Sequence, residues 1–208
     1  MADAWSTPVR VDELSTDGVD DSPEISFDGL TIRISSDRNG LVDIYRSTRA
    51  NRTAAWSTPV RVPELSSPGG DYAAAPDRGD LRVVLTRFLD GSAELLEARR
   101  SSAGGLWESP TLVSELNTPA GYEADAALGE SGLRIFYVSD VGGGQRDVVS
   151  ARRSALDQPF VPDVPIEGVN TGDNEEDPWI SEDLATIFFV SDAGGAKHIY
   201  TATRPLGP

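Results

Sequence analysis

The sequence predicts an all-β protein, a β-propeller with four blades of four short strands each. The first observation is a segment that begins Trp-Ser-Thr-Pro at Trp5, returns at Trp56, and recurs in more diverged forms at Trp107 and Phe160. The second is its period of roughly 50 residues, which is typical of propeller blades. The third is that an acidic loop and alternating, strand-like residues follow the segment. We therefore expect one domain over residues 1–208, with repeats starting near residues 5, 56, 107 and 160.

The first copy shows how the residues predict each element. Its four predicted strands are residues 9–11, 23–26, 30–35 and 42–47. An acidic, glycine-containing loop separates the first two strands. Asp28-Gly29 indicates a hairpin between the second and third, because glycine adopts a positive φ at little cost. Residues 30–35 alternate with period two, as a strand with two different faces should.

The fourth copy is one strand short, because no further tryptophan segment follows it to serve as its outer strand. We expect residues 5–14 to supply this strand and to close the ring, which would cover sheet edges that otherwise pair with other chains. This arrangement favours a monomer. A ring closed by two chains, or a segment of a longer propeller, remains an alternative.

Composition excludes several classes of function. The chain has 34 acidic against 18 basic residues and a net charge of −16, which argues against nucleic-acid partners. It has no cysteine and one histidine, His198, so thiol catalysis, disulfides and histidine-based metal clusters are excluded. No apolar stretch approaches the ~20 residues of a membrane span, so no membrane insertion is expected. The first residues lack the basic and apolar regions of a signal peptide. This fits either a cytoplasmic protein or a chain whose export signal has been removed.

The residues from Pro23 to Tyr45 combine a proline, Ser-Phe-Asp-Gly, an apolar strand, Ser-Asp-Arg-Asn-Gly and a strand ending Ile-Tyr. This pattern resembles the WD40-like repeats of TolB-type propellers, and Pro178 to Tyr200 fits it apart from Asp183-Leu184 in place of Asp-Gly. The resemblance implies a propeller that acts as a non-enzymatic interaction scaffold in the periplasm or bacterial envelope. Fold resemblance alone does not assign an activity.

Alignment of the copies places one acidic residue at the same position of every blade. These residues are Asp20, Asp71, Glu123 and Glu175. Each precedes the strand expected to be innermost, so fourfold repetition would gather four carboxylates around the channel mouth. Calcium accepts irregular sets of oxygen ligands, so we predict a calcium site there. The alternative is that the four acids lie on separate solvated loops.

The functional hypothesis is therefore a binding module with no catalytic residues. It would bind a protein, or a small polar or cationic ligand, through the acidic loop face and the channel mouth. Trp179 is the candidate aromatic contact, because it lies on an expected inner strand and breaks the repeat. The alternative is a carbohydrate-binding protein or glycoside hydrolase that uses the same mouth, since glycosidases need two nearby acids. The regularly spaced Trp5, Trp56 and Trp107 are expected to be structural.

Overall fold

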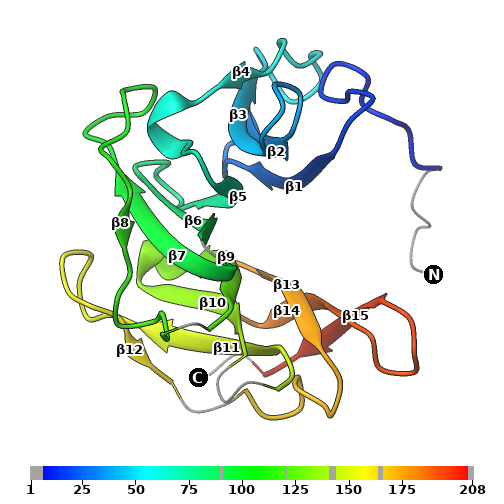
Figure 1. Cartoon of the computed structure of the whole chain (residues 1–208), viewed down its shortest axis with the longest axis vertical. Helices are drawn as coiled ribbons and strands as arrows, with labels where there is room; N and C mark the ends of the chain where they lie inside the picture. The colour runs from blue at the N-terminus through cyan, green and yellow to red at the C-terminus, as the bar shows by residue number, and fades with distance from the viewer. Residues whose placement is uncertain (1–6, 90, 120, 141–143, 164–165, 206–208) are drawn as a thin grey trace.

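The computed structural model describes residues 7–89, 91–119, 121–140, 144–163 and 166–205. Its strands form four antiparallel sheets arranged as the blades of a ring (Figure 1). This confirms the all-β, four-bladed propeller that the repeat predicts. Among the described residues, no helix has the length and apolar character needed to cross a membrane.

Each blade runs outward from an inner strand in chain order. Blade 1 contains β1 (Asp20–Ile25), β2 (Thr31–Ser36), β3 (Asp43–Thr48) and β4 (Val60–Arg61). Blade 2 contains β5 (Gly70–Pro76), β6 (Arg82–Leu89), β7 (Ser92–Arg99) and β8 (Thr111–Leu112). Blade 3 contains β9 (Glu123–Gly129), β10 (Arg134–Ser139), β11 (Asp147–Arg152) and β12 (Val161–Pro162). Blade 4 contains β13 (Glu175–Ile180), β14 (Thr186–Ser191) and β15 (His198–Thr203). Two short 3-10 turns, η1 (Pro63–Leu65) and η2 (Glu130–Gly132), lie in the connections.

Every inner strand carries a β-bulge at the same place, where its register against the next strand shifts by one residue. The extra residue has a positive φ, which is uncommon outside glycine and re-aims the chain. These residues are Ser22, Ala73, Asp125 and Asp177, with φ of 46°, 48°, 52° and 50°. The N–H group of Ala73 donates a hydrogen bond to the hydroxyl of Ser35 in the preceding blade, and that of Asp125 donates one to the hydroxyl of Thr86. In blades 2 and 3 the bulge is therefore fixed by the preceding sheet.

Adjacent blades are held together by apolar faces that pack on one another. Ile44 in β3, Leu95 in β7 and Val148 in β11 occupy equivalent positions, and each is fully buried against the following blade. Ile44, for example, packs with Val83 and Leu85 of blade 2. Because burying such a side chain contributes about 1.5–3 kcal/mol, this repeated contact is a large part of what keeps the blades together.

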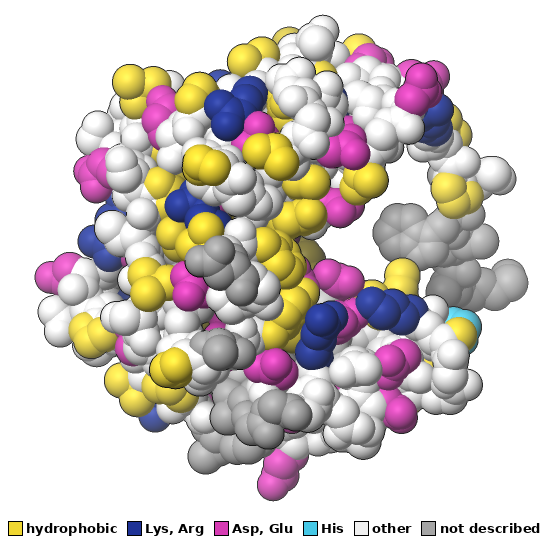
Figure 2. Space-filling model, viewed as in Figure 1, with side chains coloured by type: hydrophobic (Ala, Val, Ile, Leu, Met, Phe, Trp, Pro, Cys, Tyr) yellow, Lys and Arg dark blue, Asp and Glu magenta, His cyan; other side chains and the backbone are white. Residues whose placement is uncertain are grey.

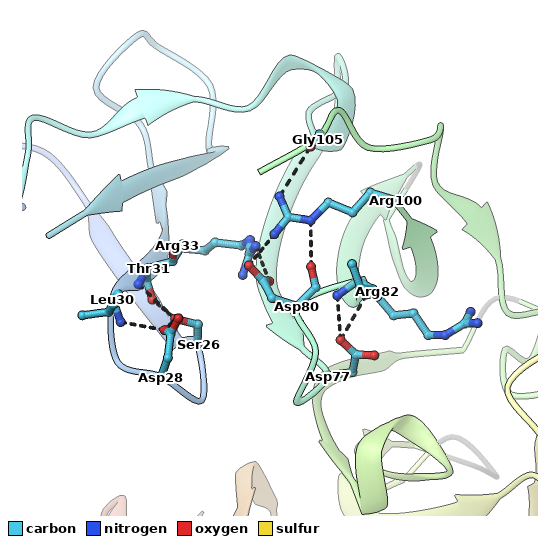
Figure 3. A network of polar contacts seen from close by, with 11 residues as sticks. Ser26, Asp28, Leu30, Thr31, Arg33, Asp77, Asp80, Arg82, Arg100 and Gly105 are labelled. Atoms are coloured by element: carbon cyan, nitrogen blue, oxygen red, sulfur yellow. Dashed lines mark hydrogen bonds and ion pairs between the residues drawn. The ribbon is translucent and has the colours of Figure 1, made fainter. Parts of the chain in front are cut away.

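A buried ion-pair network reinforces the junction of blades 1 and 2 (Figure 3). The Arg33 side chain reaches from β2 to Asp80, in the turn between β5 and β6, with an Nη2–Oδ1 distance of 2.6 Å. Arg100 pairs with the other carboxylate oxygen of Asp80, and both guanidinium groups lie near the ring of Trp107. Asp80 thus pairs with two arginines that are almost completely removed from solvent.

The tryptophan segment has a structural role in the described blades, as expected. Its first aromatic ring lies under an arginine that follows the third strand of the same blade. The pairs are Arg49 over Trp56, Arg100 over Trp107 and Arg153 over Phe160, each with the guanidinium carbon 4.3 Å from the ring centroid. Such stacking, together with the area buried, fixes the outer strand on its sheet.

The expected ring closure is not observed in the described part of the chain. The sheet of blade 4 has three strands, and residues 7–14 form no strand. An open notch lies between blades 1 and 4, with acidic side chains on its rim (Figure 2). Residues 7–13 extend from blade 1 beside this notch, and residues 1–6 lie outside the described residues. No described strand therefore pairs with the outer edge of blade 4.

Asp80→Ala should lower the free energy of unfolding by about 3–5 kcal/mol, because it leaves two buried guanidinium groups without their carboxylate. Urea denaturation monitored by tryptophan fluorescence would measure this loss. The control is Asp12→Ala, which removes the partner of Arg10 in a solvent-exposed pair and should cost under about 1 kcal/mol. Equal losses in the two variants would contradict a special role for the Asp80 network.

Candidate functional site

The four recurring acids each clasp the loop that precedes their own strand. Asp20 accepts hydrogen bonds from the N–H and hydroxyl of Thr16, and Asp71 accepts the same pair from Ser67. Thr118 donates in this way to Glu123, and Thr171 donates to Glu175, at 2.7–3.0 Å. A carboxylate that accepts a backbone N–H and a hydroxyl holds the loop much as an N-cap residue holds a helix.

The next strand supplies a second donor to each clasp. Ser139 and Ser191 donate to Glu123 and Glu175, and Arg87 bonds Asp71 at 2.6 Å. Arg38 pairs with Asp20 at 2.8 Å. Burial alone would raise the pKa of Asp20, but hydrogen bonds from Ser36, Thr16 and Arg38 lower it to about 2.

The four acids are therefore engaged within their own blades. Asp71, Glu123 and Glu175 are fully buried. Among the described residues, no three His, Asp or Glu side chains are grouped so that they could hold a metal ion. The geometry gives the calcium prediction no support, and the repeated acid is accounted for by the loop it stabilises.

A different set of acids surrounds the central channel. A cavity of about 450 Å³ is lined by Asp21 and Glu24 of β1, Asp125 of β9, and Asp177 and Trp179 of β13. A second cavity of about 390 Å³ shares Glu24, Ala127 and Trp179 with the first, so the two adjoin along the channel. The bulges explain this arrangement, because Asp125 and Asp177 are bulge residues and their backbone is turned toward the ring centre.

The channel raises the pKa values of these acids. Desolvation is the main cause for Glu24, whose pKa rises to about 8, and the charges of Asp125 and Asp177 add to it while Arg33 opposes it. Desolvation also raises the pKa of Asp125 to about 7, with Asp177 and Glu176 contributing. Burial and Glu176 raise the pKa of Asp177 as well. Glu24 and Asp125 thus bind protons at a higher pH than isolated carboxyl groups do.

Cationic groups lie beside this acidic channel. Arg146 and Lys197 both pair with Glu176, and the guanidinium carbon of Arg146 is 3.8 Å from the ring centroid of Tyr122. Desolvation and neighbouring acids raise the pKa of Tyr122 to about 12, although Arg146 opposes them. Arg146 also opposes the rise in the pKa of Asp125, and Lys197 opposes the rise in the pKa of Asp177, but burial and the neighbouring acids outweigh them.

Trp179 lies where the sequence places it, on an inner strand and on the wall of both cavities. It is 55% exposed, and its ring is tilted against that of Phe188 with centroids 5.8 Å apart. The sequence does not single out Glu24, Asp125 or Asp177 as candidate site residues. The equivalents of Glu24 are Ala75, Ala127 and Trp179, so no chemical recurrence marks the position.

The acidic loops and the Ser-Asp turns lie at the same end of the ring, as the functional hypothesis requires. Asp37 accepts the N–H of Val19, Asp140 accepts that of Tyr122, and Asp192 accepts that of Asn174. Each turn is therefore tied to the acidic loop of its own blade. Asp90, at the corresponding turn of blade 2, lies outside the described residues.

Glu175→Gln should lower the free energy of unfolding by about 1–3 kcal/mol, because the amide cannot accept all the bonds from Thr171 and Ser191. The loss should be the same in excess chelator and in millimolar calcium, measured by thermal melts in both. Asp173→Asn, at an exposed residue of the same loop, is the control. A loss seen only with calcium present would restore the metal interpretation.

Glu24→Gln should remove a pH-dependent destabilisation. The pKa of Glu24 is about 8 in the folded chain against 4.5 as its ordinary value, so its contribution to stability is complete below pH 4.5 and is lost as pH rises through 8. The variant should therefore melt above the parent at pH 8.5, with a smaller difference at pH 5.5. Asp157→Asn removes the same charge from an exposed loop and is the control. A difference independent of pH would contradict the raised pKa.

No family model matches the chain, and no curated protein is significantly similar to it in sequence. Solved structures share its fold at low identity. TolB from Acinetobacter baumannii matches at 15% identity and a TM-score of 0.57, over 90% of this chain and 40% of that one. The putative TolB from Agrobacterium tumefaciens matches at 16% identity and a TM-score of 0.56, over 90% of this chain and 59% of that one.

A thermostable family-43 glycoside hydrolase matches at 10% identity and a TM-score of 0.59, over 89% of this chain and 76% of the hydrolase. The chain thus spans about two fifths and three fifths of the two TolB structures. Likeness at these identities shows the fold alone, and the neighbours include both TolB structures and a glycoside hydrolase. In its fold, the chain is a four-bladed β-propeller similar to TolB.

Proposed function

We propose that this chain is a binding module whose central channel receives a cationic group, carried by a small polar ligand or by a protein side chain. The observation that carries the proposal is the set of Glu24, Asp125 and Asp177 around one cavity, with pKa values raised mainly by burial and further by neighbouring acids. A cation placed among them would relieve the repulsion and favour their ionised forms.

The dimensions and the overall charge support this ligand class. A cavity of about 450 Å³ falls in the range of small-molecule sites and also admits a single long side chain. The net charge of −16 would attract a cationic partner, and this steering should weaken as salt screens it. Trp179 offers a partly exposed aromatic face at the same cavity, where a cation can stack.

Binding should release protons, because a bound cation lowers the pKa values of Glu24 and Asp125 below neutrality. Calorimetric titration with spermidine, and with short peptides that contain arginine or lysine, would test this at pH 7 in buffers of different ionisation enthalpy. Asp125→Asn should reduce both the affinity and the number of protons released. Asp157→Asn, which removes an exposed charge, should change neither beyond the effect of net charge. Binding unaffected by Asp125→Asn would place the site elsewhere.

A second candidate is a carbohydrate site, either a lectin or a glycoside hydrolase. The specific observation is that Glu24, whose pKa is raised to about 8, shares one cavity with a second carboxyl group, that of Asp177. Retaining and inverting glycosidases pair a protonated acid with a second carboxylate. Turnover of aryl glycosides that disappears in Glu24→Gln would favour this candidate over the cation-binding module. A location in the cell envelope, which the TolB resemblance implies, stays part of the proposal.

A further inference from the structure

The outer edge of blade 4 lacks the cover that the other blades have. Ile199 of β15 is equivalent to Ile44, Leu95 and Val148, which are 0% exposed, yet Ile199 is 79% exposed. In blades 1 and 2 the carbonyls of Ile44 and Leu95 accept the N–H of Val62 and Val113 from the outer-strand segment. Within the described residues, β15 pairs only with β14. Its other edge is thus an open hydrogen-bonding template.

An apolar face accompanies this open edge. Phe188 of β14 is 42% exposed, whereas Val84 and Phe136 at the equivalent positions are buried between blades. Phe188 and Trp179 lie side by side on the same side of the sheet as Ile199. In the described part of the chain, no blade therefore packs on the surface that is an interblade contact elsewhere in the ring.

Arg204 shows what should cover the edge. Its Nε donates to the carbonyl of Leu184, just as Arg49, Arg100 and Arg153 donate to equivalent carbonyls in the other blades. Each of those three arginines stacks on the aromatic ring that opens the outer-strand segment. Arg204 is exposed but is already held in the stacking position. By the repeat, its aromatic partner is Trp5.

The segment from Trp5 to Val11 has the sequence of an outer strand, since it repeats Trp56 to Val62 with the same seven residues. Thr7 to Val11 form no strand in the structure, and Val9 is 84% exposed. Blade 1 predicts the register, because Arg61 lies opposite Tyr45 there. Arg10 would accordingly lie opposite Tyr200.

We propose that this segment pairs with β15 of a second copy of the chain, so that two molecules exchange their N-terminal segments reciprocally. Leu14 is packed on blade 1 with Ile32 and Ile34, and its carbonyl accepts a hydrogen bond from Arg38. The segment is thus anchored on one side of the notch, while β15 lies on the other (Figures 1 and 2). Pairing within one chain would require the ring to close, whereas exchange between two open rings does not. Such a two-fold contact buries both open edges at once.

Cysteine cross-linking tests the exchange, because the natural chain has no cysteine. Purified Arg10→Cys and Tyr200→Cys chains would be mixed and oxidised, and the disulfide identified by peptide mass. The expected result is a covalent dimer that joins one variant to the other. Its yield should be several-fold higher than that of the dimer formed by Arg10→Cys with Ser101→Cys. Ser101 is exposed in a blade 2 loop and serves as the matched control.

The double variant Arg10→Cys/Tyr200→Cys distinguishes the two ring arrangements. Exchange predicts covalent dimers, and sedimentation of the unmodified chain should give the mass of two chains. A monomer with an internal disulfide would show that the segment closes its own ring and would overturn the proposal. Cross-linking no better than the control in either experiment would also overturn it, because the segment would then not occupy β15 at all.

Discussion

The burial of one blade face by the next is the contact on which the rest of this structure depends. Ile44, Leu95 and Val148 each bridge two sheets and are fully buried. The equivalent Ile199, on which no described blade packs, is 79% exposed. Every short strand is marginal alone, so a blade persists because its two faces are covered. The loop clasps and arginine–aromatic stacks then fix the parts of each blade that lie outside this packed centre.

The channel combines strain with charge repulsion. Positive φ at Asp125 and Asp177 costs energy, and the acids repel one another in a poorly solvated space. The surrounding sheets tolerate both, because hydroxyl groups such as that of Thr86 fix the bulge from the neighbouring blade. Costs of this kind, concentrated around one cavity, are common at binding and catalytic sites.

The fold could be predicted from the sequence because the repeat is tied to a physical role in each blade. Trp56, Trp107 and Phe160 recur since an arginine stacks on each. The candidate site was harder, because an aligned position does not reveal where its side chain points. Glu123 turns toward Thr118, while Asp125, two residues later, faces the channel after a bulge. The copies show that blade 4 lacks a strand, but not which molecule supplies it.

The notch makes the ring a linear array with two ends. In such an array each unit is stabilised mainly by its nearest neighbours, and an end unit has one neighbour instead of two. Among the described residues, the apolar core of blade 4 packs against Phe136 and Val148 of blade 3. Whatever occupies the edge of β15 does more than extend one sheet, because it joins the two ends and lets all four blades unfold as a single cooperative unit.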